Sequence, residues 1–323
     1  MCTAITFNAD CFYFGRNLDL SYHYNESVTV TPRKFPFRFR NGEKTDNHFA
    51  IIGVATVADG YPLYYDATNE KGLSMAGLNF PDNAVYHPES DGKINVAPFE
   101  LIPYILGKCS TADEAYNEFE KINVWNIPFS ESFPLSPLHW IIADKNRCFT
   151  VEPMSNGVRL YENPVGVLTN NPPFDYHMYN LSNYLMLTPD EPKGKFCDYG
   201  IRPYSLGMGA VGLPGDLSSA SRFVRAAFAK TYALKGENEY ETINQFFRIL
   251  GFTEQVKGLN RLSDSESQYT VYSSCCNADR GLYYYTTYEQ REIVCIDMQK
   301  EELNGKNLAS YPMIKNKNFF HKN

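Results

Sequence analysis

The order of strand-like and helix-like segments along the chain is the feature that most constrains its fold. Three blocks of period-two sequence alternate with two pairs of segments that have helical apolar spacing. This order predicts two packed antiparallel sheets with helices on both outer faces, an α+β fold. With 323 residues, 43% of them hydrophobic, the chain can bury one large core, and we expect a single domain over residues 2–323.

The predicted strands alternate apolar and polar residues between turn signals. They cover residues 2–8, 11–17, 27–31, 35–40, 49–58, 63–68, 72–78, 138–143, 147–152, 158–161, 165–169, 269–275, 282–287 and 293–297. Asn41-Gly42 predicts a hairpin turn between 35–40 and 49–58. The predicted helices cover 97–106, 111–121, 218–234 and 241–250. The proline-rich stretch 170–215 is predicted to be an irregular loop that borders the functional site.

The charge of the chain excludes one large class of partners. A net charge of −7, with no basic run, argues against binding to nucleic acid, which needs a concentrated excess of Lys and Arg. The first residues have no basic segment followed by an apolar run, and no later stretch reaches the ~20 apolar residues of a membrane span. We therefore expect a cytoplasmic protein that does not enter a membrane.

The cysteines and histidines do not form a metal-binding or disulfide pattern. The six histidines lack HExxH or any other paired spacing, so we expect no metal and interpret them as core or surface residues. The cysteines are scattered without CxxC spacing, which in a reducing compartment indicates free thiols. They are Cys2, Cys11, Cys109, Cys148, Cys197, Cys275, Cys276 and Cys295.

The cysteine directly after the initiator Met is the strongest chemical signal. Once Met1 is removed, Cys2 carries a thiol and a free α-amine on one residue, so nucleophile and base are adjacent. The amine, with an ordinary pKa near ~8, can accept the proton of a thiol with an ordinary pKa near ~8.5. A cysteine in an apolar strand is most often a packing residue, so its position alone does not establish catalysis.

The returning strand of the first hairpin supplies charged partners for this cysteine. It carries Gly15-Arg16-Asn17-Leu18-Asp19, and Arg16 and Asp19 can reach the start of the chain. Arg16 would stabilise a thiolate, and Asp19 would accept a hydrogen bond from the α-amine. An arginine and an aspartate after a turn are also common surface residues, so this motif gains its meaning from Cys2.

Six separated segments resemble one known family. MCTAITF, FGRNLDL, MAGLNFP, GVLTNNPPFDY, GLPGDLSSASRFVR and YTVYSSCCN are similar, in order and spacing, to the signatures of choloylglycine hydrolases, the family of bile salt hydrolases and penicillin V acylases. The match covers nearly the whole chain. The resemblance implies an αββα N-terminal-nucleophile hydrolase, exposure of the cysteine by autoproteolysis or an aminopeptidase, no cofactor, and a homotetramer.

The resemblance also implies a role for individual residues. It makes Cys2 the nucleophile, Arg16 its activating cation and Asp19 the partner of the α-amine. It assigns the backbone N–H of Asn79 and the side-chain amide of Asn170 to the oxyanion. Losing one such donor typically costs ~3 kcal/mol of barrier. An Asn before prolines is otherwise typical of a turn.

The helix predicted from residue 218 carries two arginines near its start. The family pattern makes Arg222 the second active-site arginine. A cation in the first turn is unfavourable beside the helix dipole, which is consistent with a functional reason for Arg222. Arg225 lies three residues further on and is interpreted as a solvated helix position.

The substrate is predicted less directly than the chemistry. Asn79 resembles the bile salt hydrolase form, whereas penicillin V acylases tend to carry Tyr there, so we expect glycine- or taurine-conjugated bile salts, bound in part by Leu18 and Asn79. Leu18, Leu20 and the apolar loop 127–138 could line the pocket, although ordinary packing explains them equally well. Penicillin V or acyl-homoserine lactone acylase, and a non-catalytic binding protein that keeps Met1, remain alternatives.

Overall fold

Two large antiparallel sheets form the centre of the computed structural model, which describes residues 1–193, 199–314 and 321–322. The first has the strand order β14–β1–β2–β16–β17–β18, with β15 attached to β16, and the second has the order β13–β12–β11–β8–β7–β6–β3–β19. Strands that are distant in sequence are neighbours in both sheets. The first and last thirds of the chain are thereby joined around one site.

The strand bounds follow the order of the chain. The first sheet contains β1 (Cys2–Asn8), β2 (Phe12–Leu20), β14 (Val167–Leu168), β15 (Asn260–Arg261), β16 (Ser267–Asn277), β17 (Leu282–Thr287) and β18 (Val294–Asp297). The second contains β3 (Ser27–Thr31), β6 (Ile51–Ala58), β7 (Tyr61–Asn69), β8 (Ser74–Asn79), β11 (Leu138–Ala143), β12 (Cys148–Met154), β13 (Gly157–Glu162) and β19 (Ala309–Pro312). Two small pairs are β4 (Phe37–Arg38) with β5 (Lys44–Thr45), and β9 (Ile94–Val96) with β10 (Ile122–Val124).

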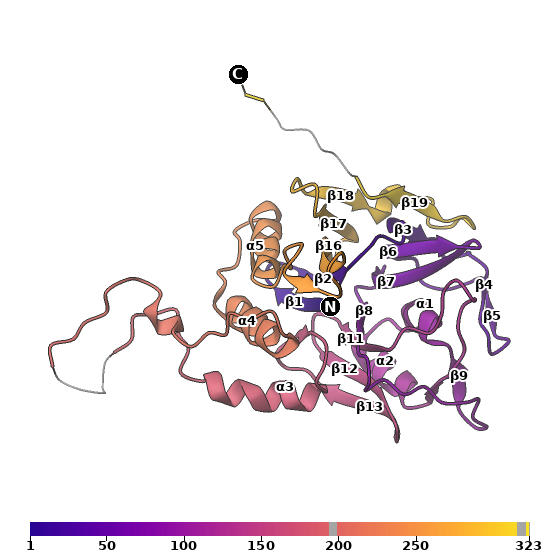
Figure 1. The fold of residues 1–323 in the computed structure, drawn as a ribbon. Helices are drawn as coiled ribbons and strands as arrows, with labels where there is room; N and C mark the ends of the chain where they lie inside the picture. The colour runs from indigo at the N-terminus through magenta and orange to yellow at the C-terminus, as the bar shows by residue number, and fades with distance from the viewer. Residues whose placement is uncertain (194–198, 315–320, 323) are drawn as a thin grey trace.

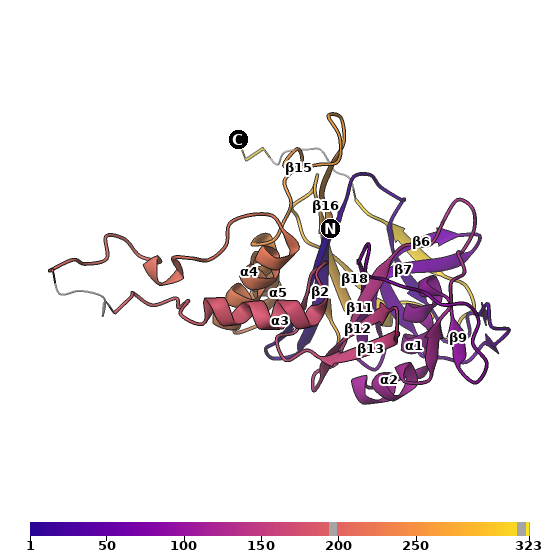
Figure 2. The same ribbon diagram turned by 60° about the horizontal axis from the view of Figure 1, so that its bottom comes forward.

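Helices cover the outer face of each sheet (Figure 2). On the second sheet lie α1 (Leu101–Lys108) and α2 (Ala112–Phe119), and on the side of the first sheet lie α3 (Phe174–Asn180), α4 (Ser219–Tyr232) and α5 (Glu239–Gly251). One apolar cluster fills the space between the sheets and beneath α4 and α5, and a second lies between the second sheet and α1 and α2. The predicted α+β fold with two packed sheets and two outer helical layers is confirmed.

The inner strands of both sheets are buried on both faces. Every residue of β1 except its last is buried, as are the first six residues of β6, IIGVAT. A sheet with one wet face would instead alternate strictly between apolar and polar side chains. Cys2 therefore begins a strand that lies wholly inside the protein.

Three predictions about elements were wrong. Asn41-Gly42 joins β4 to β5, while β6 pairs with β3 and β7, because Phe37 and Phe39 leave the sheet to pack in the α1 cluster. The helix predicted from residue 97 begins as a 3-10 turn at Pro98–Glu100, and α1 starts at Leu101. The stretch 170–215 is not wholly irregular, since it contains α3 and two 3-10 turns, Leu181–Tyr184 and Met208–Ala210.

Part of that stretch projects from the body of the molecule as an arm (Figure 1). We call the described residues 185–193 and 199–213 the projecting arm. Seven of its large apolar side chains are each at least 72% exposed, which is unusual for a surface that contacts only water. They are Leu185, Met186, Tyr199, Ile201, Tyr204, Leu206 and Val211.

Two further expectations can be compared with the described residues. Within the ranges given above, none of the helices combines the length and the apolar character that crossing a bilayer requires. The seven cysteines in those ranges carry free thiols, and Cys197 lies outside them.

Candidate active site

Cys2 opens β1 at the edge of a partly open cavity. It pairs with Leu18 of β2 in the antiparallel register and is 3% exposed. Cys2, Arg16 and Asn79 all line a cavity of about 350 Å³. The hairpin predicted from the sequence therefore brings the thiol, the arginine and one face of the second sheet together.

The cavity lies where two strands of the second sheet separate. Pairing between β7 and β8 runs from Thr68↔Ser74 to Asp66↔Ala76 and ends there, next to a register shift at the β6–β7 pair. In the gap, Nη1 of Arg16 donates to the carbonyl oxygens of Tyr65 at 3.0 Å and Gly77 at 2.6 Å. The guanidinium thus replaces the strand partners that these two carbonyls have lost.

The charge of Arg16 is balanced inside the protein. Burial alone would lower its pKa, but the charges of Cys2, Tyr272, Asp66 and Asp19 raise it above its usual range. Asp66 is itself fully enclosed and accepts hydrogen bonds from the hydroxyls of Tyr272 and Tyr283. The Nη2 atom of Arg16 has no hydrogen-bond partner among the described residues, although it is buried beside the cavity. Arg16 therefore keeps one donor free for an anion at the thiol.

Asp19 is buried with one oxygen unused. Oδ1 accepts a hydrogen bond from the hydroxyl of Thr270 at 2.7 Å, while Oδ2 has no partner in the described part of the chain. Burial raises the pKa of Asp19, and the chain's terminal ammonium, Arg222, Thr270 and Arg16 oppose that rise. A buried oxygen of this kind favours a nearby cationic donor.

Met1 is present in the structure and covers the nitrogen of Cys2. Its amino group donates to the carbonyl oxygen of Asp19 and to Oε1 of Gln268, each at 2.8 Å. Its carbonyl oxygen accepts from the backbone N–H of Asp19 at 2.9 Å. The nitrogen of Cys2 is a peptide amide here and donates to Oδ1 of Asn170 at 2.9 Å. Removal of Met1 would convert that nitrogen into an amine at the same place.

Asn170 connects the two sheets at the site. Its Nδ2 donates to the carbonyl oxygen of Asn79 at 2.7 Å, and its Oδ1 also accepts from Nη2 of Arg222 at 2.7 Å. The backbone N–H of Asn170 donates to the hydroxyl of Ser219 at 2.7 Å. A side-chain amide nitrogen carries two protons, so Asn170 has a second one that the bond to Asn79 does not use.

The backbone of Asn79 is oriented by the same strand separation. Phe80 donates its N–H to the carbonyl of Pro137 at 2.8 Å, toward β11. Successive residues in an antiparallel strand point their N–H groups to opposite edges, so the N–H of Asn79 points to the edge that β7 has left. The carbonyls of Gly77 and Asn79 face that edge too, where Arg16 and Asn170 bind them.

The structure distinguishes clearly between the two arginines of α4. Ser218 caps the helix, and Arg222 donates to the carbonyl of Cys2 and, at 2.8 Å, to the hydroxyl of Thr3. Burial lowers the pKa of the Arg222 guanidinium. Arg225 was predicted to be solvated, and that was wrong. It is 9% exposed and donates to the carbonyls of Phe252, Pro214 and Asp216. It therefore links the segment before α4 to the C-terminal end of α5.

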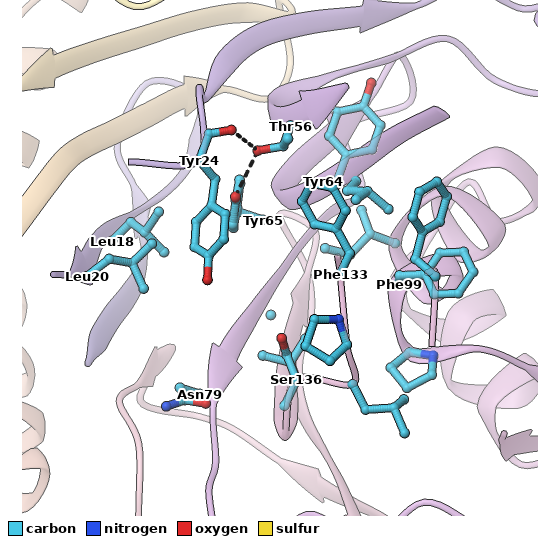
Figure 3. Close-up of a pocket in the computed structure, with 18 of the residues that line it drawn as sticks. Leu18, Leu20, Tyr24, Thr56, Tyr64, Tyr65, Asn79, Phe99, Phe133 and Ser136 are labelled. Atoms are coloured by element: carbon cyan, nitrogen blue, oxygen red, sulfur yellow. Dashed lines mark hydrogen bonds between the residues drawn. The ribbon is translucent and has the colours of Figure 1, made fainter. Parts of the chain in front are cut away.

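The cavity walls are mostly apolar (Figure 3). Leu18 and Leu20 lie on one side with Tyr24, and Phe99 and Phe133 lie on the other. The loop predicted to line the pocket does so through Pro128, Phe129, Ser132, Phe133, Pro134, Leu135 and Ser136. A few hydroxyls are set into these walls, and Thr56 binds both the backbone of Tyr24 and the phenol of Tyr65. Such a wall suits a large apolar ligand with few polar groups.

Several residues at the site were not predicted as site residues. Tyr65, Gly77 and Thr270 bind Arg16 or Asp19, and Asp66 acts on Arg16 through its charge, because the strands that carry them become neighbours. Within the described ranges, no cluster of three His, Cys, Asp or Glu side chains could hold a metal ion. A thiol, a buried cation and Asn79 line the cavity, and a second cation, a buried carboxyl group and the amide of Asn170 lie next to them without lining it.

Comparisons with known proteins agree with one another. A family model described as linear amide C–N hydrolases, choloylglycine hydrolase family, matches residues 2–311. The chain is 51% identical to a protein named bile salt hydrolase/transferase from Lactiplantibacillus plantarum, over 97% of both chains. It is 36% identical to a protein of the same name from Clostridium perfringens, over 100% of both.

Solved structures show the same likeness. A variant of the conjugated bile acid hydrolase from Clostridium perfringens matches with a TM-score of 0.92 and 35% identity over 100% of both chains. A penicillin V acylase from Agrobacterium tumefaciens matches with a TM-score of 0.76 and 20% identity, covering 96% of this chain and 90% of that one. At that identity the second likeness concerns the fold alone.

Proposed function

The chain belongs to the choloylglycine hydrolase family of linear amide C–N hydrolases, and from that membership we propose that it cleaves the amide bond of bile salts conjugated to glycine or taurine. The products are the free bile acid and the amino acid. The observation that carries the proposal is the placement of Cys2 and Arg16 at the edge of a largely apolar cavity. The full-length similarity to proteins named as bile salt hydrolases supports the same substrate.

In the reaction we assign, removal of Met1 frees the α-amine, which accepts the thiol proton of Cys2. The free donor of Arg16 faces the resulting thiolate, and Oδ2 of Asp19 accepts from the α-ammonium. The thiolate attacks the amide carbon, and the N–H of Asn79 and Nδ2 of Asn170 bind the oxyanion. The α-ammonium then protonates the leaving amine, and water cleaves the thioester to release the bile acid.

Arg222 has a supporting part in this proposal. It touches the carbonyl of Cys2 and Oδ1 of Asn170, so it fixes the nucleophile and one oxyanion donor relative to each other. Leu18 and Asn79 supply contacts to the substrate beside the scissile bond, since both line the cavity next to Cys2. Because Cys2 and Arg16 belong to one sheet and Asn79 to the other, we propose that residues 2–323 act as a single domain.

A side-by-side assay tests the substrate. We expect the processed enzyme to hydrolyse glycodeoxycholate and taurodeoxycholate at least tenfold faster, by kcat/KM, than penicillin V, because the cavity walls suit a steroid. Ninhydrin detection of released glycine and taurine, and chromatography of the penicillin nucleus, give the rates. Faster penicillin cleavage would assign the chain to the acylase branch. An acyl-homoserine lactone serves as a third substrate.

A second activity is favoured by the names of four relatives, which include transferase. A thioester can pass its acyl group to an amine as well as to water. The same assay, run on taurodeoxycholate in the presence of isotopically labelled glycine, tests it. Labelled glycodeoxycholate would indicate transfer, and free deoxycholate alone would indicate hydrolysis only.

We further propose a homotetramer in the cytoplasm, with the projecting arm as a subunit contact. The free thiols of the described cysteines suit a reducing compartment. Replacing Leu185, Met186 and Leu206 of the arm with Asp is expected to dissociate the assembly, measured by light scattering after gel filtration, because charges at an apolar contact are costly. Each side chain is at least 80% exposed, so the fold should not change.

The control for the arm is Leu234→Asp, which changes a side chain that is 81% exposed but lies just after α4. This variant should keep the mass of the unmodified protein. An arm variant with an unchanged mass would contradict the proposed contact.

A further inference from the structure

Two buried histidines lie behind the segments that carry the oxyanion donors. His139 on β11 and His177 on α3 are both 0% exposed. Nε2 of His139 lies 3.0 Å from the carbonyl oxygen of Thr169, and Nε2 of His177 lies 2.9 Å from the carbonyl oxygen of Asn170. Two consecutive carbonyls next to the catalytic amide are therefore each held by a different imidazole.

Both ring nitrogens of His139 face oxygen acceptors. Nδ1 lies 3.1 Å from Oε1 of Glu152 on β12, which is also 0% exposed. Oε1 accepts in addition from the backbone N–H of Phe174 at 2.9 Å, at the start of α3. The contacts to Thr169 and Glu152 can form together only if Nε2 carries a proton and a further proton lies between Nδ1 and Oε1. His139 and Glu152 thus link the carbonyl of Thr169 to the start of α3.

The ring of His139 also supports the second oxyanion segment. It stacks on Phe80 with ring centroids 4.2 Å apart and planes 6° apart. Phe80 follows Asn79 directly, and β11 pairs with β8 at Leu138↔Asn79 and His139↔Leu78. One side chain therefore contacts the neighbours of both donors, Asn79 and Asn170.

His177 fixes the other side of Asn170. Burial lowers its pKa to about 4, so the ring is neutral at physiological pH and its proton is on Nε2, where the carbonyl of Asn170 accepts it. The ring stacks on Phe223 of α4, with centroids 4.8 Å and planes 14° apart. Phe223 is adjacent to Arg222, which binds Oδ1 of the same asparagine.

We propose that His139, with its partner Glu152, and His177 are positioning residues that hold the amide of Asn170 and the backbone of Asn79 at oxyanion geometry. The inference rests on the proposed amide hydrolysis and adds residues that touch no substrate. A displacement of a donor by about 1 Å is enough to lose much of its effect on the transition state. None of the hydrogen bonds of His139 or His177 goes to Cys2 or Arg16.

The test separates oxyanion geometry from thiol reactivity. His139→Phe keeps an aromatic ring beside Phe80 but removes both hydrogen bonds, and kcat for taurodeoxycholate is expected to fall about tenfold or more with KM within twofold. The rate at which iodoacetamide alkylates Cys2 should stay within twofold, because Arg16 and the α-amine are untouched. His139→Gln retains a donor toward Thr169 and should recover part of kcat.

His48 provides a matched control. It is 8% exposed, its two ring nitrogens face the carbonyls of Phe49 and Phe35, its ring packs on Phe37, and it is not among the residues that line the cavity. His48→Phe should lower the melting temperature as His139→Phe does while leaving kcat unchanged. If His139→Phe does not fold, His177→Phe replaces it, since it keeps the stack on Phe223 and removes only the donor to Asn170.

Two results would overturn the proposal. One is a kcat that falls no further in the His139 or His177 variant than in His48→Phe. The other is an alkylation rate that falls in parallel with kcat, which would indicate general disruption of the site. Failure of the unmodified enzyme to cleave conjugated bile salts would instead contradict the proposed function, and the alkylation rates would still be measurable.

Discussion

Replacing Cys2 with Ala is expected to lower kcat for taurodeoxycholate by about 10⁴-fold or more. The proposed covalent path has no other nucleophile, and enzymes that lose theirs typically lose this much or more. Ala is small enough that Met1 should still be removed, so the α-amine remains. The cavity walls are unchanged, and the binding of the conjugate, measured by calorimetry with the inactive variant, should be retained.

Cys295→Ala is the control for this variant. Cys295 is an exposed free thiol on β18, in the same sheet as Cys2. Its loss should leave kcat and KM unchanged. If Cys2→Ala kept more than about a tenth of the activity, the thioester route would be wrong.

A chain whose first residue precedes Cys2 is expected to have no measurable hydrolysis. In the structure the Cys2 nitrogen is an amide that donates to Asn170, and the terminal amine of Met1 binds Asp19 and Gln268 instead. An amide nitrogen cannot accept the thiol proton, nor return one to the leaving amine. Asp19 would also keep an oxygen, Oδ2, without its cationic partner.

An N-terminal extension that ends in a protease site immediately before Cys2 makes this measurable. The extended protein should be inactive, and cleavage to a free Cys2 should restore hydrolysis in proportion to the cleaved fraction found by intact mass. The same extension on the C-terminus is the control and should not lower kcat. Full activity in a chain whose mass still includes the extension would exclude the α-amine as the base.

The layered fold follows from patterns that the sequence displays openly. The period-two pattern of β1 and β2 depends on residues a few positions apart, and so do the helix caps at Thr111 and Ser218. Local sequence therefore predicts both. The helix α3 was missed because its first N–H group depends on a distant partner. Phe174 donates to Glu152 on β12, and β13 and β14 lie between the two residues in the chain.

The residues of the candidate site could be predicted where they belong to a sequence motif. Their contact partners could not be predicted where they come from distant strands. Cys2, Arg16, Asp19, Asn79, Asn170 and Arg222 do lie together, and their chemical roles remain predictions. Arg225 was misjudged because helical spacing gives the direction of a side chain but not the loop that covers it. His139 and His177 are not spaced like metal ligands or catalytic residues. Their positions next to Thr169 and Asn170 depend on the register of β8 with β11 and on the turn into α3.

The separation of β7 from β8 opens a cavity whose proposed reacting groups and whose opposite wall come from different parts of the chain. The groups that we propose to act on the amide belong to β1, β2, β8 and the segment around Asn170, whereas much of the opposite wall comes from the irregular stretch 128–136. Loops tolerate sequence change better than buried strands do. Mutations in that stretch can therefore alter which acyl groups are admitted while the reaction is inherited intact, and it is where laboratory evolution toward new amides should concentrate.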